Sequence, residues 1–311
     1  MEKTKKLNII GQLLLLAATV VWGTSFFILK ETISEVPAFY VIAIRFIVAG
    51  LGLLLIFIKK LKGIDKKDIL RGAFLGLCLA GAYVAQTIGL QHTTPGRNAF
   101  ITSSYCVMCP FLTWLIFKKR PKLYNIISAV TCVIGIGFIA LSGSKIGGNK
   151  TLFGDGLTLI GAVFFGLQII FIDKFQKDGY DSFKLLVPEI LTAGLFFLIC
   201  SAVFELPMQG IGAYALNKEQ LIKILYLTIA CTLFAQSAQI IGQKFTTANQ
   251  SAIILSLESV FGTFFSVLFA DEQLTAWLII GFIVVFIAIL ITELKIDPIK
   301  LLKKKKHSNE E

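Results

Sequence analysis

Three ionisable residues lie inside long apolar stretches of the sequence: Arg45, Glu189 and Glu258. A charged side chain is costly in such surroundings and is therefore a candidate for a functional role. Glu258 is near the middle of its stretch, so its carboxyl must face a water-filled cavity, find a partner or be protonated. Binding a proton from one side of a membrane and releasing it to the other is the chemistry that this position would allow. A structural carboxyl bonded to a neighbouring helix explains the position equally well.

A second set of candidates consists of polar and aromatic residues within the expected spans, some of them spaced for one face of a helix. Residues three apart in a helix share a face, and Tyr83 and Gln86 have this spacing. Such side chains can bind a small solute in a shared cavity, or they can hold neighbouring helices together. The candidates for substrate binding are Trp22, Ser25, Tyr83, Gln86, Ser103, Tyr105, Phe165, Gln168, Gln236, Gln239 and Ser256.

Common catalytic and metal-binding motifs are missing from the sequence. It has no H-E-x-x-H or G-x-S-x-G, and its two histidines, His92 and His307, lie at a loop edge and in the tail. The six cysteines fall inside apolar runs, which suits buried small side chains better than disulfides or a metal site. We therefore expect no enzyme activity, no metal and no cofactor. A membrane-embedded enzyme and a receptor or scaffold without transport are the alternatives.

The candidate residues must be positioned by helices within a membrane. Hydrophobic residues make up 56% of the 311 residues and charged residues 16%, and the mean hydropathy is +0.79. A soluble domain carries about 25% charged residues, so this composition predicts an integral membrane protein with a lipid bilayer as its partner. The net charge of +11 does not indicate a nucleic-acid partner, because the basic residues lie in short blocks between apolar runs.

Apolar runs of about 20 residues can span a bilayer as helices. If the N-terminus is cytoplasmic, the basic blocks at 59–71, 118–122 and 295–306 fall inside, whereas single residues such as Lys30 and Arg97 fall outside. This asymmetry follows the positive-inside rule and predicts a multi-pass protein of the cell (cytoplasmic) membrane with both termini cytoplasmic. The expected spans lie at approximately 10–30, 37–58, 69–91, 95–117, 123–142, 154–173, 183–204, 219–243, 248–269 and 274–294.

The sequence also repeats itself. HTTPGRNAFITSSYCVMC at 92–109 overlays FTTANQSAIILSLESVFG at 245–262, and the first apolar run overlays the sixth. Each copy, 1–144 and 145–297, holds five expected spans, and a basic cytoplasmic tail, 298–311, follows the second copy. Because five is odd, the second copy enters the membrane from the opposite face. Such inverted repeats around a central cavity are typical of secondary transporters, which carry small-molecule substrates.

The repeat gives expectations for particular residues. Thr94 is a candidate N-cap with Pro95 at the first helical position. Pro110 in the first copy and Gly262 in the second are hinge candidates. Arg45 and Glu189 are nearly equivalent in inverted halves, so we expect them to lie towards opposite faces and not to pair. Helix ends, loop groups or head groups near its own face would neutralise each charge, and a gating or substrate role is the alternative.

These motifs carry a family resemblance. The WG of the first span, the RFIVA at 45–49, the TT-x-x-x-x-A helix starts and the LESV at 257–260 resemble the EamA-type branch of the drug/metabolite transporter superfamily. The chain has Ser259 where that branch often has proline. The resemblance implies a ten-helix bundle, two inverted five-helix repeats around a central cavity, and movement of metabolites or drugs across the cell membrane, often as export.

The expected cargo follows from the scarcity of cations in the spans. Arg45 is the single Arg or Lys well within an expected span, and phosphorylated solutes require clusters of such residues. Aromatic and amide side chains suit small amphipathic solutes such as amino acids, other metabolites or lipophilic cations, among which the sequence does not choose. Protons are a candidate coupling ion.

Overall fold

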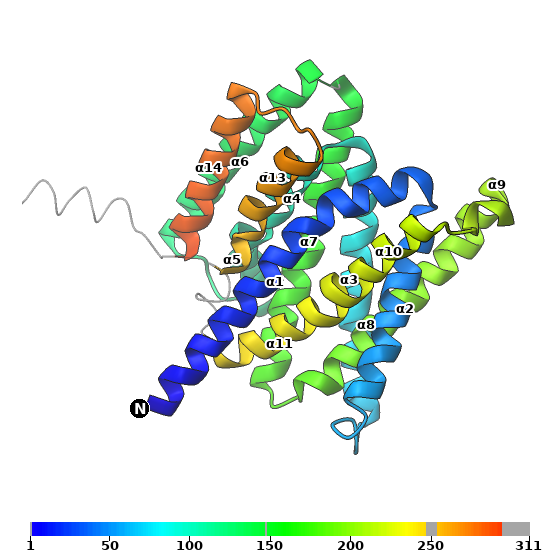
Figure 1. Cartoon of the computed structure of the whole chain (residues 1–311). Helices are drawn as coiled ribbons and strands as arrows, with labels where there is room; N and C mark the ends of the chain where they lie inside the picture. Colours follow the sequence, from blue (N-terminus) through cyan, green and yellow to red (C-terminus); the bar gives the residue numbers. More distant parts are fainter. Residues whose placement is uncertain (1, 147, 247–253, 294–311) are drawn as a thin grey trace, which may run out of the picture.

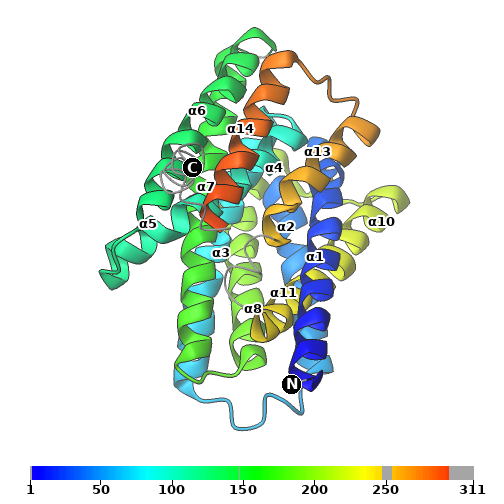
Figure 2. The same ribbon diagram turned by 90° about the vertical axis from the view of Figure 1, so that its left-hand side faces the viewer.

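The computed structural model describes residues 2–146, 148–246 and 254–293, and the elements assigned in these ranges are helices (Figures 1 and 2). Segments η1 and η3 have the wider π-helical hydrogen-bond pattern, and η2 is a 3₁₀ turn. In chain order the elements are α1 Glu2–Glu35, α2 Ala38–Ile56, α3 Lys66–His92, α4 Pro95–Ser103, α5 Tyr105–Phe117, α6 Leu123–Ile146, α7 Gly148–Lys177, α8 Ser182–Cys200, η1 Ser201–Glu205, α9 Leu206–Gln209, η2 Ile211–Tyr214, α10 Lys218–Tyr226, η3 Leu227–Phe234, α11 Ala235–Phe245, α13 Glu258–Phe269 and α14 Ala276–Glu293.

Within these ranges, seven helical segments are long and apolar enough to cross a membrane, and three shorter apolar helices cover Leu123–Ile139, Ile254–Phe269 and Ala276–Ile291. Large hydrophobic side chains point outward from the bundle, as at Leu55 and Val133, each 70% exposed. Apolar surface on this scale is unfavourable in water and favourable against lipid. The chain is therefore a multi-pass helical membrane protein.

Helices from the two halves of the chain interleave. Figure 1 shows α6 beside α14 at one edge of the bundle and α2 beside α8 at the opposite edge, with α1, α3, α7 and α11 between them. Helix α3 packs on α7 and α8, and α1 packs on α11 and α13. In the predicted repeat, α1 corresponds to α7, α2 to α8, α5 to α13, and α3 to the continuous segment of α10, η3 and α11. The contacts correspond in the same way: α3–α7 to α11–α1, α3–α8 to η3–α2, and α5–α7 to α13–α1.

Two equivalent helix crossings are made by glycines. A methyl group on Gly242 of α11 would lie 2.9 Å from the carbonyl oxygen of Gly11 in α1. A methyl group on Gly154 of α7 would lie 2.7 Å from the carbonyl oxygen of Gly89 in α3. Contacts under about 3 Å are closer than side-chain carbons tolerate, so both crossings require glycine for backbone-to-backbone approach.

The fourth apolar run is broken into α4 and α5. Thr94 caps α4 and Pro95 is its first residue, as predicted. The break lies at Ser104, whose N–H and hydroxyl both donate to the carbonyl of Ile101, at 3.2 and 2.6 Å. The same tight turn precedes α13, where the N–H of Leu257 donates to the carbonyl three residues earlier at 3.1 Å. Because Pro110 lies inside α5, the interruption is not at the proline.

Candidate functional site

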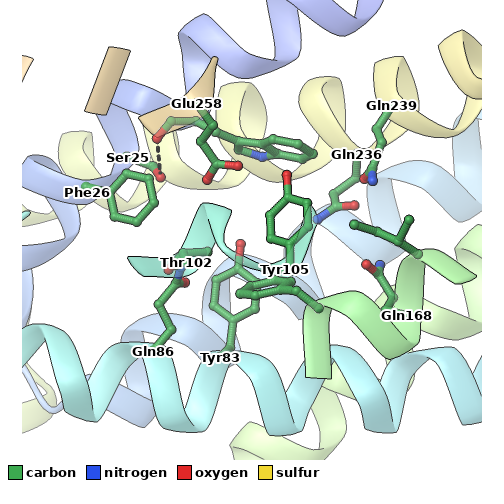
Figure 3. Close-up of a pocket in the computed structure, with 13 residues that line it drawn as sticks. Ser25, Phe26, Tyr83, Gln86, Thr102, Tyr105, Gln168, Gln236, Gln239 and Glu258 are labelled. Atoms are coloured by element: carbon green, nitrogen blue, oxygen red, sulfur yellow. Dashed lines mark hydrogen bonds between the residues drawn. The ribbon is translucent and has the colours of Figure 1, made fainter. Parts of the chain in front are cut away.

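A small cavity of about 40 Å³ lies between α1, α3, α4, α5, α7, α11 and α13 (Figure 3). Both halves of the chain contribute to it, because the two interleaved sets of helices meet there. Its lining is aromatic, amide, hydroxyl and carboxyl, with one aliphatic side chain. The lining residues are Trp22, Ser25, Phe26, Tyr83, Gln86, Thr102, Tyr105, Phe165, Gln168, Ile169, Gln236, Gln239 and Glu258.

Most of the candidates chosen from the sequence meet in this cavity, but Ser103 and Ser256 do not line it. Both serines are completely buried elsewhere in the packing. Ser103 is two residues before Tyr105, and residues two apart in a helix point to nearly opposite sides. Thr102, three residues before Tyr105, shares its face and takes the expected place. The same spacing rule, applied from Trp22, would have found Phe26 four residues later.

Glu258 directs its carboxyl into the cavity. Its side chain is 8% exposed, and within the described ranges no hydrogen bond or ion pair engages its carboxyl oxygens. Figure 3 shows the carboxyl and the hydroxyls of Tyr83 and Tyr105 pointing into the same space. Glu258 is also the first residue of α13, where the helix dipole stabilises negative charge.

Arg45 does not line the cavity; it lies behind Tyr83, which does, and it is 1% exposed. Its Nε donates to the hydroxyl of Thr232 at 2.5 Å, and Nη2 donates to the hydroxyl of Tyr83 at 3.1 Å and to the carbonyl of Cys231 at 3.4 Å. Trp22 Nε1 donates to that same carbonyl at 2.8 Å. The prediction that groups near a membrane face neutralise Arg45 is wrong, because the π-helical turn of η3 presents a hydroxyl and a carbonyl inside the bundle.

Glu189 has a parallel position behind the cavity. Its Oε1 accepts a hydrogen bond from Nε2 of Gln168 at 2.5 Å, and the side chain is 1% exposed. No ion pair between Glu189 and Arg45 occurs among the described residues. Each buried charge instead holds one cavity side chain in place, Gln168 in this case and Tyr83 in the other.

A larger pocket of about 680 Å³ adjoins the cavity, and Tyr105 and Ile169 line both. Its other walls are the later part of α5, the connection 118–122, the first turn of α6 and the ends of α7 and α11. Asn8 donates to the carbonyl of Phe245 at 3.0 Å, which places the beginning of α1 beside the end of α11. The larger pocket therefore lies at the end of the bundle where α1 begins, which we call the N-terminal end.

The opposite end of the bundle is closed by buried charges. Arg97 and Asp155 form an ion pair and are 2% and 6% exposed. Thr93 donates its hydroxyl to Asp155 Oδ1 at 2.6 Å, and Arg97 Nε lies 3.3 Å from the same oxygen. Arg97, which the sequence places on the outer side, is therefore buried and paired at that end of the bundle. Its partner is on α7, 58 positions away, and only the packing of α7 beside α4 brings the two together.

Further charges complete this closure. Glu272 accepts from the backbone N–H of Gly96 at 2.8 Å and from the hydroxyls of Thr94 and Ser266, so a carboxylate sits on the positive end of α4. Lys30 donates to three carbonyls at the end of α3, at 2.5, 2.9 and 3.2 Å. We call this group the α3–α4 cluster; it consists of Lys30, Thr93, Thr94, Arg97, Asp155 and Glu272. Asn98 joins it to the cavity wall by donating to the carbonyl of Gln86 at 3.2 Å.

Comparison with known proteins identifies relatives over nearly the whole chain. The model of the EamA-like transporter family matches twice, over residues 9–141 and 152–294. An uncharacterized transporter of Archaeoglobus fulgidus is 29% identical over 278 residues, covering 89% of this chain and 83% of that protein. The uncharacterized transporter YoaV of Bacillus subtilis is 20% identical over 270 residues, covering 86% and 91%. One solved crystal structure has a TM-score of 0.65 and 14% identity, covering 91% of this chain and 97% of that chain, and bears on the fold alone.

Proposed function

Because the chain belongs to the EamA-like transporter family, we propose that it is a secondary transporter that carries small organic solutes through the central cavity by alternating access. The family and the relatives' names indicate a transporter and not an enzyme. The observation that carries the proposal is a polar cavity between a wide pocket at one end and the α3–α4 cluster at the other. A site open towards one side and sealed from the other is one state of an alternating-access cycle.

The proposed architecture is ten spanning helices in two inverted repeats, 1–144 and 145–297. Three observations support it. The family model matches each half separately, the helix contacts keep their pattern when the halves are exchanged, and the glycine crossings occur at equivalent positions. Lys118 and Asp271, which follow α5 and α13 and are 153 positions apart, also share a left-handed backbone conformation, with φ of 59° and 50°.

We place the protein in the cell membrane with both termini in the cytoplasm, on the strength of the positive-inside rule. The larger pocket at the N-terminal end then opens to the cytoplasm, and the α3–α4 cluster closes the external side. In this state the cavity takes up solute from the cytoplasm, as an exporter does. Opening of the cluster would release the solute outside.

Glu258 is the proposed site of proton coupling. It is buried, lies in the cavity and has no partner within the described ranges, so solute and proton can compete for it. The titratable groups facing it are the phenols of Tyr83 and Tyr105, and the nearest charge behind Tyr83 is Arg45. An imposed pH gradient should therefore drive transport by the wild-type protein and not by Glu258→Gln.

The test is solute counterflow in proteoliposomes, with amines, amino acids and dyes supplied one at a time, with and without a pH gradient. Exchange of labelled for unlabelled solute separates a transporter from a receptor, which binds without exchange. Absence of exchange for all solutes would contradict the transport function. Unchanged pH-driven transport by Glu258→Gln would contradict the coupling role alone.

A further inference from the structure

We infer that the solute is a small organic cation whose ammonium or guanidinium head lies between the aromatic rings and is held by Glu258. The inference rests on the proposed transport function, and it selects one of the solute classes that the sequence leaves open. It follows from the charge, the ring arrangement and the size of the cavity.

The charge of the cavity is one-sided. Glu258 is the one acidic side chain in the lining, and the lining contains no Lys, Arg or His among the described residues. Arg45 does not reach the cavity, because its guanidinium donates to Thr232, Tyr83 and Cys231 behind the wall. An anion or the carboxylate of an amino acid would meet a negative group in the lining, whereas the nearest cation, Arg45, lies behind Tyr83. Charge interactions are strong at a buried site of low dielectric, so this asymmetry discriminates between solutes.

The rings of the cavity suit a cation. Phe165 lies between the two tyrosines, with ring centroids 5.6 Å from Tyr83 and 6.4 Å from Tyr105, and Trp22 and Phe26 complete the lining. Aromatic faces within about 6 Å attract ammonium and guanidinium groups. The amide oxygens of the cavity glutamines supply acceptors for N–H groups.

The size of the cavity limits the head group. A volume of about 40 Å³ has room for roughly three water-sized groups, which fits a primary ammonium and its first carbons. Because Tyr105 and Ile169 line both spaces, the rest of the solute can extend into the larger pocket of about 680 Å³.

The basic entrance does not reverse this selectivity. Lys119, Arg120 and Lys122 line the larger pocket but are exposed, and exposed charges are screened by salt within about 8 Å at physiological ionic strength. Lys174 and Lys177 at the end of α7 are paired with aspartates four positions away, Asp178 just past the helix at 2.6 Å and Asp173 within it at 2.5 Å. Selection therefore occurs at the buried carboxyl of Glu258.

The experiment measures binding of four probes with a common phenyl ring to the purified full chain at pH 7 by isothermal titration calorimetry. The probes are phenethylamine (cation), phenylalanine (zwitterion), 3-phenylpropionate (anion) and 2-phenylethanol (neutral). We expect phenethylamine to bind about tenfold or more tightly than 2-phenylethanol, since a hydrogen bond to a charged group contributes at least that factor. Glu258→Gln should remove this preference while 2-phenylethanol still binds, which shows that the variant is folded, and Glu258→Asp should restore part of it.

Glu205→Gln is the matched control. Glu205 is also a buried carboxyl, but it accepts from the backbone N–H groups of Phe39 and Tyr40 at the start of α2, outside the cavity lining. This variant should keep the cation preference. Four outcomes overturn the inference. They are equal binding of the four probes, preference for the zwitterion or anion, a cation preference that survives Glu258→Gln, and no binding up to millimolar concentration. Counterflow of anions or amino acids alone would refute the inference and leave the transport function standing. Selective cation binding without any counterflow would support the inference and contradict the transport function.

Discussion

Neutralising Asp155 should open the α3–α4 end of the bundle. In Asp155→Asn, the guanidinium of Arg97 stays buried at 2% exposure but loses the carboxylate that engages both Nε and Nη2. Breaking a buried ion pair by removing one partner costs about 3–5 kcal/mol. The cost applies to the closed state, because opening of this end exposes Arg97 to water. Since 1.4 kcal/mol corresponds to a factor of ten, a shift of about 3 kcal/mol raises the population open at this end about a hundredfold.

The assay is labelling from the external side. Thr102 lines the cavity, so Thr102→Cys is the reporter, in a chain with its six native cysteines replaced. A membrane-impermeant thiol reagent added outside reaches this cysteine only when the α3–α4 end is open. Asp155→Asn should increase the external labelling rate and decrease the rate from the cytoplasmic side. The exchanged pair Arg97→Asp with Asp155→Arg should return both rates towards the wild type.

Asp173→Asn on the same helix is the control. Asp173 pairs with Lys177 at 2.5 Å, with side chains 49% and 68% exposed, and pairs this exposed contribute about 0–1 kcal/mol. Its external labelling rate should equal that of the reporter alone. If Asp155→Asn leaves external labelling unchanged in a folded protein, or if both asparagine variants increase it equally, the ion pair does not hold this end closed.

Two further predictions concern stability, measured by thermal unfolding in detergent. Gly135→Ala should destabilise the protein by about 1–3 kcal/mol, because the added methyl lies 2.7 Å from a side-chain atom of Val285 in α14. The control is Gly137→Ala in the same helix, where the added methyl meets nothing within 4 Å and the change should be neutral or slightly stabilising. Thr232→Val should cost about 1–3 kcal/mol by leaving the Nε of Arg45 without its 2.5 Å acceptor. Thr228→Val, which removes only a bond to the preceding turn of its own helix, should cost less, and equal losses in the two threonine variants would refute the role of Arg45.

The apolar runs and the helix start at Thr94 could be predicted from the sequence, because hydropathy and capping are local properties. The cavity lining followed from helical spacing where two residues were three apart, as for Tyr83 and Gln86. Ser103, which was chosen from its correspondence with Ser256 in the repeat, is two residues from Tyr105 and does not line the cavity.

The partners of the buried charges could not be predicted in this way. The sequence places Arg97 in the first turn of the span at 95–117, whereas its aspartate lies on α7, 58 positions away. Likewise, the acceptors of Arg45 become available only where η3 departs from the regular α-helix. Pairings of this kind depend on tertiary packing, on which a single sequence carries no local signal.

The glycine crossings also bear on how the bundle can move. At Gly11–Gly242 and Gly154–Gly89, the backbones of the two helices lie in contact, flanked by side chains such as Leu15 and Thr158. The glycines themselves present no side chain that has to change its rotamer when one helix turns on the other. Each crossing joins a helix of one half of the chain to a helix of the other, and the two crossings lie towards opposite ends of the bundle. We expect the helices to rotate as rigid bodies about these two points. Side chains that interdigitate elsewhere should move together with the helix that carries them.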